Sequence, residues 1–196
     1  QSRACGDGDE FTHETWATDA RDLATHIGLT RLAVLGHSYG GFLALEYAVR
    51  WPDMLTHLVL VATSAGPVRV QFPMLDTDIQ LREHFRDRWP RFFHGENKHW
   101  DLFVTLTFSA VAFNTAFTRA LPKYDLRDRV ASLETPMLLV VGRQDAYLPH
   151  MEWLADHAKQ ATLCVLNDVG HFPFVEAPNE FIRTVASFLG SAGDAV

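Results

Sequence analysis

The sequence predicts an α/β domain built on a mostly parallel sheet, with helices on both faces and one helical insertion. Short apolar runs alternate along the chain with amphipathic segments of helical period, which is typical of parallel strands joined by helices. A stretch of about sixty residues without strand signals interrupts this alternation and is too long for a simple crossover. We therefore expect a core formed by residues 1–66 and 132–196, and a helical cap, the insertion, over residues 67–131.

The expected elements follow from apolar spacing and from glycine and proline signals. Apolar residues at 3–4 spacing, Leu23 and Ile27 among them, give the first helix an amphipathic pattern, and Gly28 ends it. Pro52 ends the second helix, because proline disfavours helical geometry in the residue before it. In chain order we expect a helix over 15–27, a strand over 31–35, a helix over 42–50, a strand over 55–63, a helical stretch over 68–130, a strand over 137–141, a helix over 152–159, a strand over 162–166 and a helix over 179–189.

The composition excludes several classes of protein. The formal net charge is −7 and no basic stripe appears, so nucleic acid is a poor candidate for a partner. With 47% hydrophobic residues the chain is not of the disordered type, and no apolar run approaches the roughly 18 residues of a membrane span. Cys5 and Cys164 can pair once, but they match no disulfide framework or metal-ligand spacing, which favours a reducing compartment. We expect a cytoplasmic protein with no cofactor, metal or membrane partner; its oligomeric state does not follow from the sequence.

A candidate nucleophile lies in residues 36–41, GHSYGG, between an expected strand and an expected helix. This G-x-S-x-G pattern is typical of a turn so tight that the residues two before and two after the serine must be small, here Gly36 and Gly40. The turn projects the hydroxyl of Ser38 at the C-terminal edge of the sheet. Because the following helix points its N-terminus at the serine, the backbone N–H of Tyr39 can stabilise an oxyanion.

A serine hydroxyl needs a base to activate it, and the base needs an acid to orient it. Asp145 follows the expected strand 137–141, and His171 follows the expected strand 162–166. Both therefore fall on loops at the same end of the sheet as Ser38, in the chain order Ser, Asp, His. We predict that Ser38, His171 and Asp145 form a catalytic triad.

Other polar residues compete less well for these roles. Asp168 is a second candidate acid, but it is only three residues from the candidate base on the same loop. The side chain of His37 leaves the turn in another direction, so we assign it a structural or pocket-lining role. We expect Glu46 to make a local polar contact. His94 and His99 match no standard metal-site spacing and are expected on a solvated loop.

The elbow, the position of the insertion and the tail GHFPFVEAP at 170–178 resemble the α/β-hydrolase superfamily, in its proline iminopeptidase and esterase-like branch. The resemblance runs from Arg3 to the C-terminus. It implies that Ser38 is the nucleophile, that His171 acts as general base and then as general acid, and that Asp145 orients His171. Haloalkane dehalogenases and epoxide hydrolases of this fold carry aspartate at the nucleophile position, so Ser38 argues against both.

The start of the chain also carries a resemblance. Residues 1–6, QSRACG, begin without Met or a signal-peptide pattern and resemble the Asp-x-Arg-Gly-x-Gly turn that follows the fourth strand of the family. This implies that four strands, with the His-Gly loop that supplies the second oxyanion N–H, are absent from this chain. We therefore expect the C-terminal portion of a longer protein. For the chain alone we expect an exposed apolar edge at 31–35, poor folding and weak activity.

The substrate is less defined than the nucleophile. Half of the 14 phenylalanines lie between Phe85 and Phe117, which suggests an apolar pocket wall, although most of them are expected to pack the insertion itself. We expect His37, Phe108 and Phe172 to contact a small-molecule substrate.

The leading hypothesis is a serine hydrolase that forms an acyl-enzyme with an ester or small amide carrying an apolar acyl or aromatic group. A proline iminopeptidase is the first alternative; it needs carboxylates near the substrate amine, and Glu83 and Glu96 are the only glutamates in the insertion. A slow-turnover ligand-binding receptor and an inactive fragment of a longer hydrolase are the others.

Overall fold

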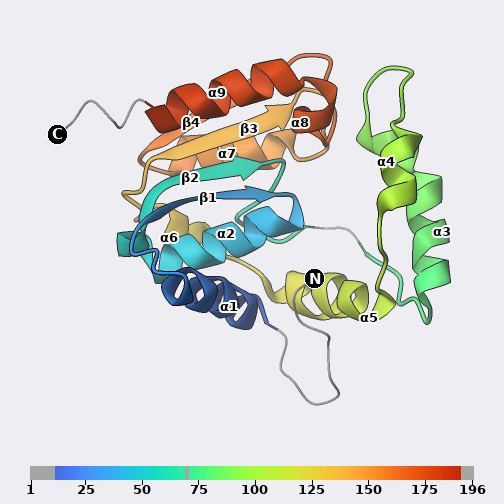
Figure 1. The fold of residues 1–196 in the computed structure, drawn as a ribbon, viewed down its shortest axis with the longest axis horizontal. Coiled ribbons are helices and arrows are strands. Elements are labelled where there is room, and N and C mark those ends of the chain that lie inside the picture. Colours follow the sequence, from blue (N-terminus) through green and yellow to red (C-terminus); the bar gives the residue numbers. More distant parts are fainter. Residues whose placement is uncertain (1–11, 69–70, 191–196) are drawn as a thin grey trace.

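The computed structural model describes residues 12–68 and 71–190. Four parallel strands form one sheet in the order β1-β2-β3-β4 (Figure 1). The register pairs Val34 with Leu58 and Val59 with Leu138. The predicted parallel sheet is confirmed, with strands β1 (Leu32–His37), β2 (Leu55–Val61), β3 (Met137–Gly142) and β4 (Ala161–Leu166).

Two apolar cores lie on the two faces of this sheet. Side chains alternate along β2, so Leu58 and Leu60 enter one core and Val59 and Val61 enter the other. Helices α2 and α7 cover the first face, and α9 covers the second (Figure 1). The helices of the core are α1 (His13–His26), α2 (Tyr39–Arg50), the short η1 (Pro52–Met54), α7 (Leu148–His157), the short α8 (Pro173–Glu176) and α9 (Pro178–Gly190).

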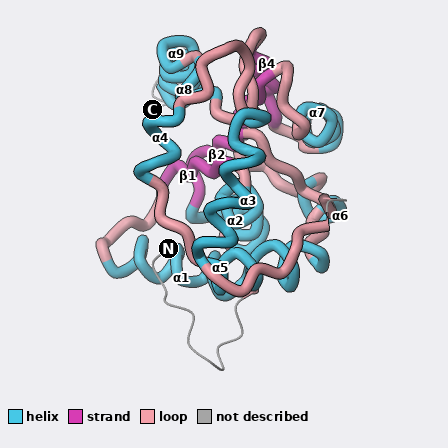
Figure 2. The backbone as a smooth tube through the Cα atoms, turned by 90° about the vertical axis from the view of Figure 1, so that its right-hand side faces the viewer, coloured by secondary structure: helices cyan, strands magenta, loops and turns pink. Residues whose placement is uncertain are grey.

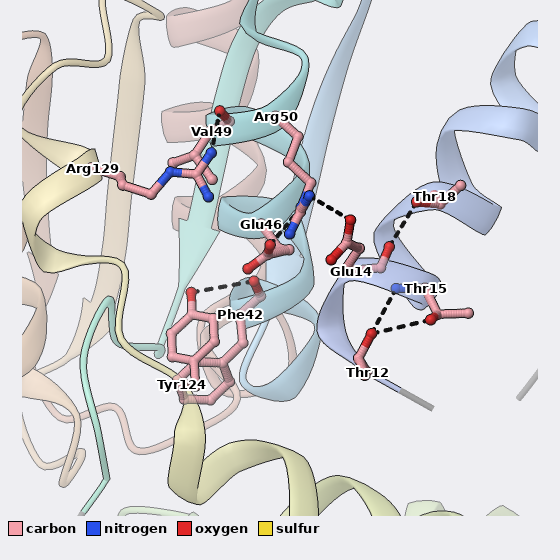
Figure 3. A network of polar contacts seen from close by, with 10 residues as sticks. All are labelled: Thr12, Glu14, Thr15, Thr18, Phe42, Glu46, Val49, Arg50, Tyr124 and Arg129. Carbon is pink, nitrogen blue, oxygen red and sulfur yellow. Dashed lines mark hydrogen bonds and ion pairs between the residues drawn. The ribbon is translucent and has the colours of Figure 1, made fainter. Parts of the chain in front are cut away.

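Helix α1 packs along α2 and is joined to it by a polar network (Figure 3). Arg50 donates from Nε to Glu46 Oε1 at 2.6 Å and from Nη1 to Glu14 Oε1 at 2.8 Å. Glu46 is buried, so its carboxylate needs this cation. The predicted local polar contact of Glu46 is confirmed.

The buried face of α1 differs from the predicted one. Ala17 and Ala24 are buried against the core, whereas Leu23 and Ile27 are 61% and 60% exposed. Leu35 on the edge strand β1 is also 49% exposed, which agrees with the predicted exposed apolar edge. In the described part of the chain no element packs against these three side chains closely enough to bury them.

Several boundaries shift for local reasons. The first strand continues to His37 and α2 starts at Tyr39, so the turn between them is tighter than predicted. The second strand ends at Val61, because Ala62 adopts a positive φ of 50°. Helix α7 begins at Leu148 and has a proline in its first turn. Backbone N–H groups in the first turn have no intrahelical acceptor, so proline, which has no N–H, costs no hydrogen bond there.

The described part of the insertion is helical, but it consists of short pieces rather than long helices. Proline at the start of η2 and of η4 interrupts the helical path. Two aromatic clusters, one around Phe113 and one around Trp89, pack the first pieces together, whereas Leu121 of η4 and Val130 of α6 enter the core beneath the sheet. They are α3 (Asp78–Arg88), η2 (Trp89–Phe92), α4 (Trp100–Thr105), α5 (Ala110–Phe113), the π-helical η3 (Asn114–Ala120), η4 (Leu121–Lys123) and α6 (Arg127–Val130).

The insertion stands at the carboxyl edge of the sheet. In Figure 1 the strand arrows point toward the side on which α3 and α4 lie, and in Figure 2 these helices lie in front of β1 and β2. Loops that follow parallel strands emerge at this edge, where ligands bind in open α/β sheets. The arrangement places the insertion over the loops that carry the candidate site residues.

Candidate active site

Ser38 occupies the turn between β1 and α2 with φ 51° and ψ −118°. Such a conformation is strained for a residue other than glycine and persists only where its surroundings hold it. The Ser38 N–H donates to the Val61 carbonyl at 2.8 Å, and the Ser38 carbonyl accepts from the Gly41 N–H and from Thr63 Oγ1, each at 2.9 Å. The end of β2 and the residues after it therefore hold the turn.

Glycine is required at positions 36 and 41 of this turn, and the expectation of a small residue at position 40 is wrong. A Cβ on Gly36 would lie 2.4 Å from the Gly40 carbonyl oxygen, and a Cβ on Gly41 would lie 2.5 Å from the Thr63 side chain. A Cβ on Gly40 would meet no atom within 4 Å. Gly36 therefore allows the end of β1 to approach the first turn of α2, and Gly41 allows α2 to approach Thr63, which follows β2.

The structure brings the three predicted triad residues together in one hydrogen-bonded chain. His171 Nε2 lies 2.9 Å from Ser38 Oγ, and His171 Nδ1 lies 2.9 Å from Asp145 Oδ2. Both His171 and Asp145 are buried. The other carboxylate oxygen of Asp145 accepts the Tyr147 N–H at 3.1 Å, so the acid is held on both sides.

Close backbone contacts connect the loops that carry the acid and the histidine. The Gln144 N–H donates to the Val169 carbonyl at 3.1 Å, and the Val169 N–H donates to Gln144 Oε1 at 3.0 Å. A Cβ on Gly142 would lie 2.1 Å from the Val169 carbonyl oxygen, so only glycine permits this approach. The sequence analysis missed these contacts, since nothing in the spacing shows which loops touch.

A second set of contacts joins the histidine loop to the insertion. The His171 N–H donates to the Phe92 carbonyl at 2.7 Å. Glu176 accepts the Gly170 N–H on Oε1 at 2.8 Å and the His94 N–H on Oε2 at 2.7 Å. One carboxylate therefore bridges both segments, a role that the sequence analysis did not assign to it.

His37 lies beside the histidine of the triad but makes a different contact. Its Nε2 is 2.8 Å from the His171 carbonyl oxygen, so this nitrogen carries the proton and donates. Burial lowers the pKa of His37 to about 4, aided by the nearby His171 ring, which keeps His37 neutral near pH 7. The ring also contacts Phe172 and Phe174, at centroid distances of 5.1 and 5.0 Å.

The rejected alternatives lie apart from this chain of hydrogen bonds. The side chain of Asp168 is 83% exposed, and its nearest charged partner is His94 at 3.6 Å. His99 adopts a left-handed backbone before α4, and its ring lies 5.0 Å from the Phe93 ring in a tilted arrangement. Among the described residues, no group of three or more His, Cys, Asp or Glu side chains is placed to hold a metal ion.

A cavity of about 1270 Å³ opens above Ser38 and His171. Phe108, Phe172 and His37 are among its lining residues. Tyr147 and His150 also line it, although the sequence analysis did not single them out. Burial, and then the Asp145 charge, raise the pKa of Tyr147 to about 12, and its ring stacks on His171 at a centroid distance of 5.5 Å.

Tyr39 connects the turn to two other segments. Its hydroxyl lies 3.0 Å from His13 Nε2 on α1 and donates to the Ala116 carbonyl of η3 at 3.4 Å. Its backbone N–H belongs to the first turn of α2, where N–H groups have no intrahelical carbonyl partner. The Tyr39 side chain thus contacts the insertion, while its main chain begins the helix that follows Ser38.

Residues 2–184 match the family model described as alpha/beta hydrolase family. The chain belongs to the alpha/beta hydrolase family. The chain is 28% identical to 2-hydroxymuconate semialdehyde hydrolase of Pseudomonas putida, over 93% of this chain and 71% of that protein. It is 22% identical to a proline iminopeptidase of Lactobacillus acidophilus, over 91% of this chain and 72% of that protein.

A solved hydrolase structure from Pseudomonas aeruginosa shares the fold of this α/β hydrolase, with a TM-score of 0.79. The two are 24% identical in sequence, and the match covers 97% of this chain and 76% of that chain. This likeness shows the fold and leaves the activity open. In the stretches that the structure describes, no helix combines the length and apolar character needed to cross a membrane.

Proposed function

We propose that this α/β hydrolase is a serine hydrolase that acts through an acyl-enzyme on an ester or small amide. The observation that carries the proposal is the continuous chain from Asp145 through His171 to Ser38, with both side-chain contacts at 2.9 Å. A base within hydrogen-bond reach of the hydroxyl, itself oriented by a buried acid, is what activation of a serine requires.

In the proposed reaction Ser38 Oγ attacks the substrate carbonyl carbon while His171 Nε2 takes the hydroxyl proton. The tetrahedral intermediate collapses, the leaving group departs with the proton from His171, and an acyl-serine ester remains. Water then attacks this ester, with His171 again taking and returning one proton, and the acid product leaves. Asp145 stabilises the imidazolium in both halves without taking the proton itself.

The Tyr39 N–H is the proposed donor to the oxyanion. It belongs to the residue after the nucleophile, at the N-terminus of α2, where the helix dipole also favours negative charge. His37 is proposed to hold the backbone of His171 through its bond to the carbonyl, rather than to act as a base.

The aromatic lining of the cavity supports a substrate with an apolar acyl or aromatic group. Phe108 and Phe172 are proposed to contact it. A proline iminopeptidase needs carboxylates for the substrate amine. In the described part of the lining, Asp19 is the one carboxylate besides Asp145, whereas two arginines are present. The charge of the lining therefore favours the ester or amide hydrolase.

A fluorophosphonate probe tests the proposal, with Ser38→Ala as the key variant and Ser64→Ala as the matched control. Ser64 is the control of choice because its Oγ lies 3.2 Å from His150 Nδ1, which makes it a second serine–histidine pair. We expect labelling of the parent and of Ser64→Ala, and none of Ser38→Ala. Labelling that survives Ser38→Ala, or an unlabelled parent that melts cooperatively, contradicts the proposal. A parent that is labelled by the probe but hydrolyses an ester substrate only once per molecule would support the slow-turnover receptor instead.

A further inference from the structure

The cavity above Ser38 carries a cationic edge in addition to its aromatic wall. Arg88 ends α3 and Arg91 lies in η2, and both line the same cavity as Ser38 and His171. Both side chains are exposed to solvent. Two arginines therefore line a chamber whose other lining residues are mostly apolar.

Arg88 is held in one orientation by the turn of α3 before it. Its Nη1 donates to His84 Nδ1 at 3.1 Å and to the His84 carbonyl at 3.2 Å. Burial, and then the Arg88 charge, lower the pKa of His84, which suits a neutral ring that accepts this bond. With Nη1 engaged, the Nε and Nη2 edge of the guanidinium remains, and this edge presents two parallel N–H groups to a carboxylate.

Carboxylates neutralise some of the described arginines and not others. Arg50 contacts the carboxylates of Glu14 and Glu46, and Arg127 contacts Asp125. Among the described residues, no carboxylate lies within 4.0 Å of the Arg88 or Arg91 guanidinium.

The carboxylates of the lining itself do not change this. Asp145 is bonded to His171, and Asp19 belongs to α1, away in sequence from α3 and η2.

We propose that Arg88 and Arg91 form a carboxylate-recognising subsite, so that the substrate cleaved at Ser38 carries a carboxylate separated from the scissile carbonyl by an apolar body. This inference rests on the proposed function and names its substrate class. The apolar body lies against the phenylalanines of the insertion, and the carboxylate reaches Arg88 at the cavity edge. The subsite selects substrate and takes no part in bond breaking.

The first arm of the test compares two esters that differ only at the end of the acyl chain, 4-nitrophenyl hydrogen suberate and 4-nitrophenyl octanoate. We expect the kcat/KM of the suberate, divided by that of the octanoate, to fall tenfold or more in Arg88→Gln and in Arg91→Gln. The fall should come chiefly from a higher KM for the suberate. Arg86→Gln is the matched control, because Arg86 is an exposed arginine of α3 outside the lining. Raising the salt concentration should also lower this suberate-to-octanoate ratio for the parent protein, because salt screens the attraction between guanidinium and carboxylate.

The second arm needs no turnover. In the Ser38→Ala background, calorimetric titration should show 4-phenylbutyrate binding at least tenfold more tightly than 4-phenylbutyramide, with the difference lost in the Arg88→Gln double variant. An unchanged ester ratio, or equal binding of acid and amide, overturns the subsite. If neither ester is hydrolysed in a Ser38-dependent way, the proposed function fails, while the titration still decides whether the subsite exists.

Discussion

The loops at the strand ends and the wall of the insertion form two halves of the same cavity by different means. Ser38, His171 and Asp145 are joined by directional bonds of 2.9 Å, and close backbone contacts hold the loops that carry them. The insertion contributes aromatic rings such as Phe85, Phe108 and Phe113, and the centroid of Phe85 lies 5.8 Å from each of the other two. The loops at the strand ends are suited to chemistry that needs fixed atomic positions. The wall of the insertion is suited to selecting substrates by their shape.

The two halves meet at a narrow seam. On the side of the histidine loop it includes the bond from the His171 N–H to the Phe92 carbonyl and the two bonds accepted by Glu176. These contacts involve the backbone of the histidine loop. A change in the insertion therefore shifts the main chain of this loop and with it the position of the His171 side chain. Substitutions in each half, and at the seam, should therefore have separable effects.

Loss of a triad side chain should abolish most of the activity while leaving the fold intact. We expect His171→Ala to lower kcat by about 10⁴-fold or more, and Asp145→Asn to lower it by about 10²–10⁴-fold, since a missing or misoriented base cannot activate Ser38. Steady-state hydrolysis of a 4-nitrophenyl ester measures the loss, and thermal melts check the fold. An active His171→Ala enzyme would show that another group serves as the base.

The turn itself offers a paired test of backbone geometry. Gly36→Ala places a Cβ 2.4 Å from a backbone oxygen, so the strand end and α2 must separate; we expect destabilisation of about 3 kcal/mol or more and loss of activity. Gly40→Ala meets open space, and alanine favours a helix, so stability should stay equal or rise slightly. Urea unfolding of both variants decides, and equal effects would contradict the assignment of the close approach to Gly36.

Acid should destabilise the fold through two histidines, the buried His13 and the half-buried His37. Burial lowers the pKa of His13 and of His37 to about 4, below the ordinary value of 6.5. Between these values the unfolded chain binds protons that the native state does not, so stability is complete above about pH 6.5 and is lost as pH falls toward 4. A shift of this size corresponds to about 3 kcal/mol at most for each ring.

Urea unfolding at pH 7, 5.5 and 4.5 measures this slope. His13→Gln should be less stable than the parent at pH 7, because its contact with the Tyr39 hydroxyl changes, but its stability should depend less on pH. If the free energy of unfolding depends on pH in the same way in the parent and in His13→Gln, His13 does not contribute to the loss of stability in acid.

These tests also mark what the sequence could and could not predict. The parallel sheet, the turn around Ser38 and the meeting of Asp145 with His171 follow from local signals, because parallel strands bring the loops after them to one edge. The closeness of Gly36 and Gly41 to their neighbours depends on tertiary packing, and the choice of Gly40 instead was wrong. The face of α1 was also mispredicted, because periodicity shows which residues share a face but not which face finds a partner.

The seam should respond to Glu176→Gln with an intermediate effect. The amide offers one carbonyl oxygen where the carboxylate accepted two N–H groups, so either the Gly170 N–H or the His94 N–H loses its acceptor. We expect destabilisation of about 1–3 kcal/mol and a roughly tenfold lower kcat, because the His171 loop is less well held. A control at exposed Glu180→Gln on α9 should change neither quantity. Full activity in Glu176→Gln would show that the other contacts of the loop, the bond to Phe92 among them, hold it without this carboxylate.

The smallest effect is expected from the wall of the insertion. Phe108 lines the cavity and packs against Phe85 and Phe103, so Phe108→Ala removes substrate contact area along with some packing within the insertion. We expect KM for an aryl ester to rise about three- to tenfold with kcat within about twofold, because a lost apolar contact weakens ground state and transition state alike. Val104→Ala, at a side chain 65% exposed outside the lining, is the matched control. A drop in kcat at unchanged KM would instead mean that Phe108 acts on the position of His171 through the aromatic cluster around Trp89, and that the two halves of the cavity are less separable than their contacts indicate.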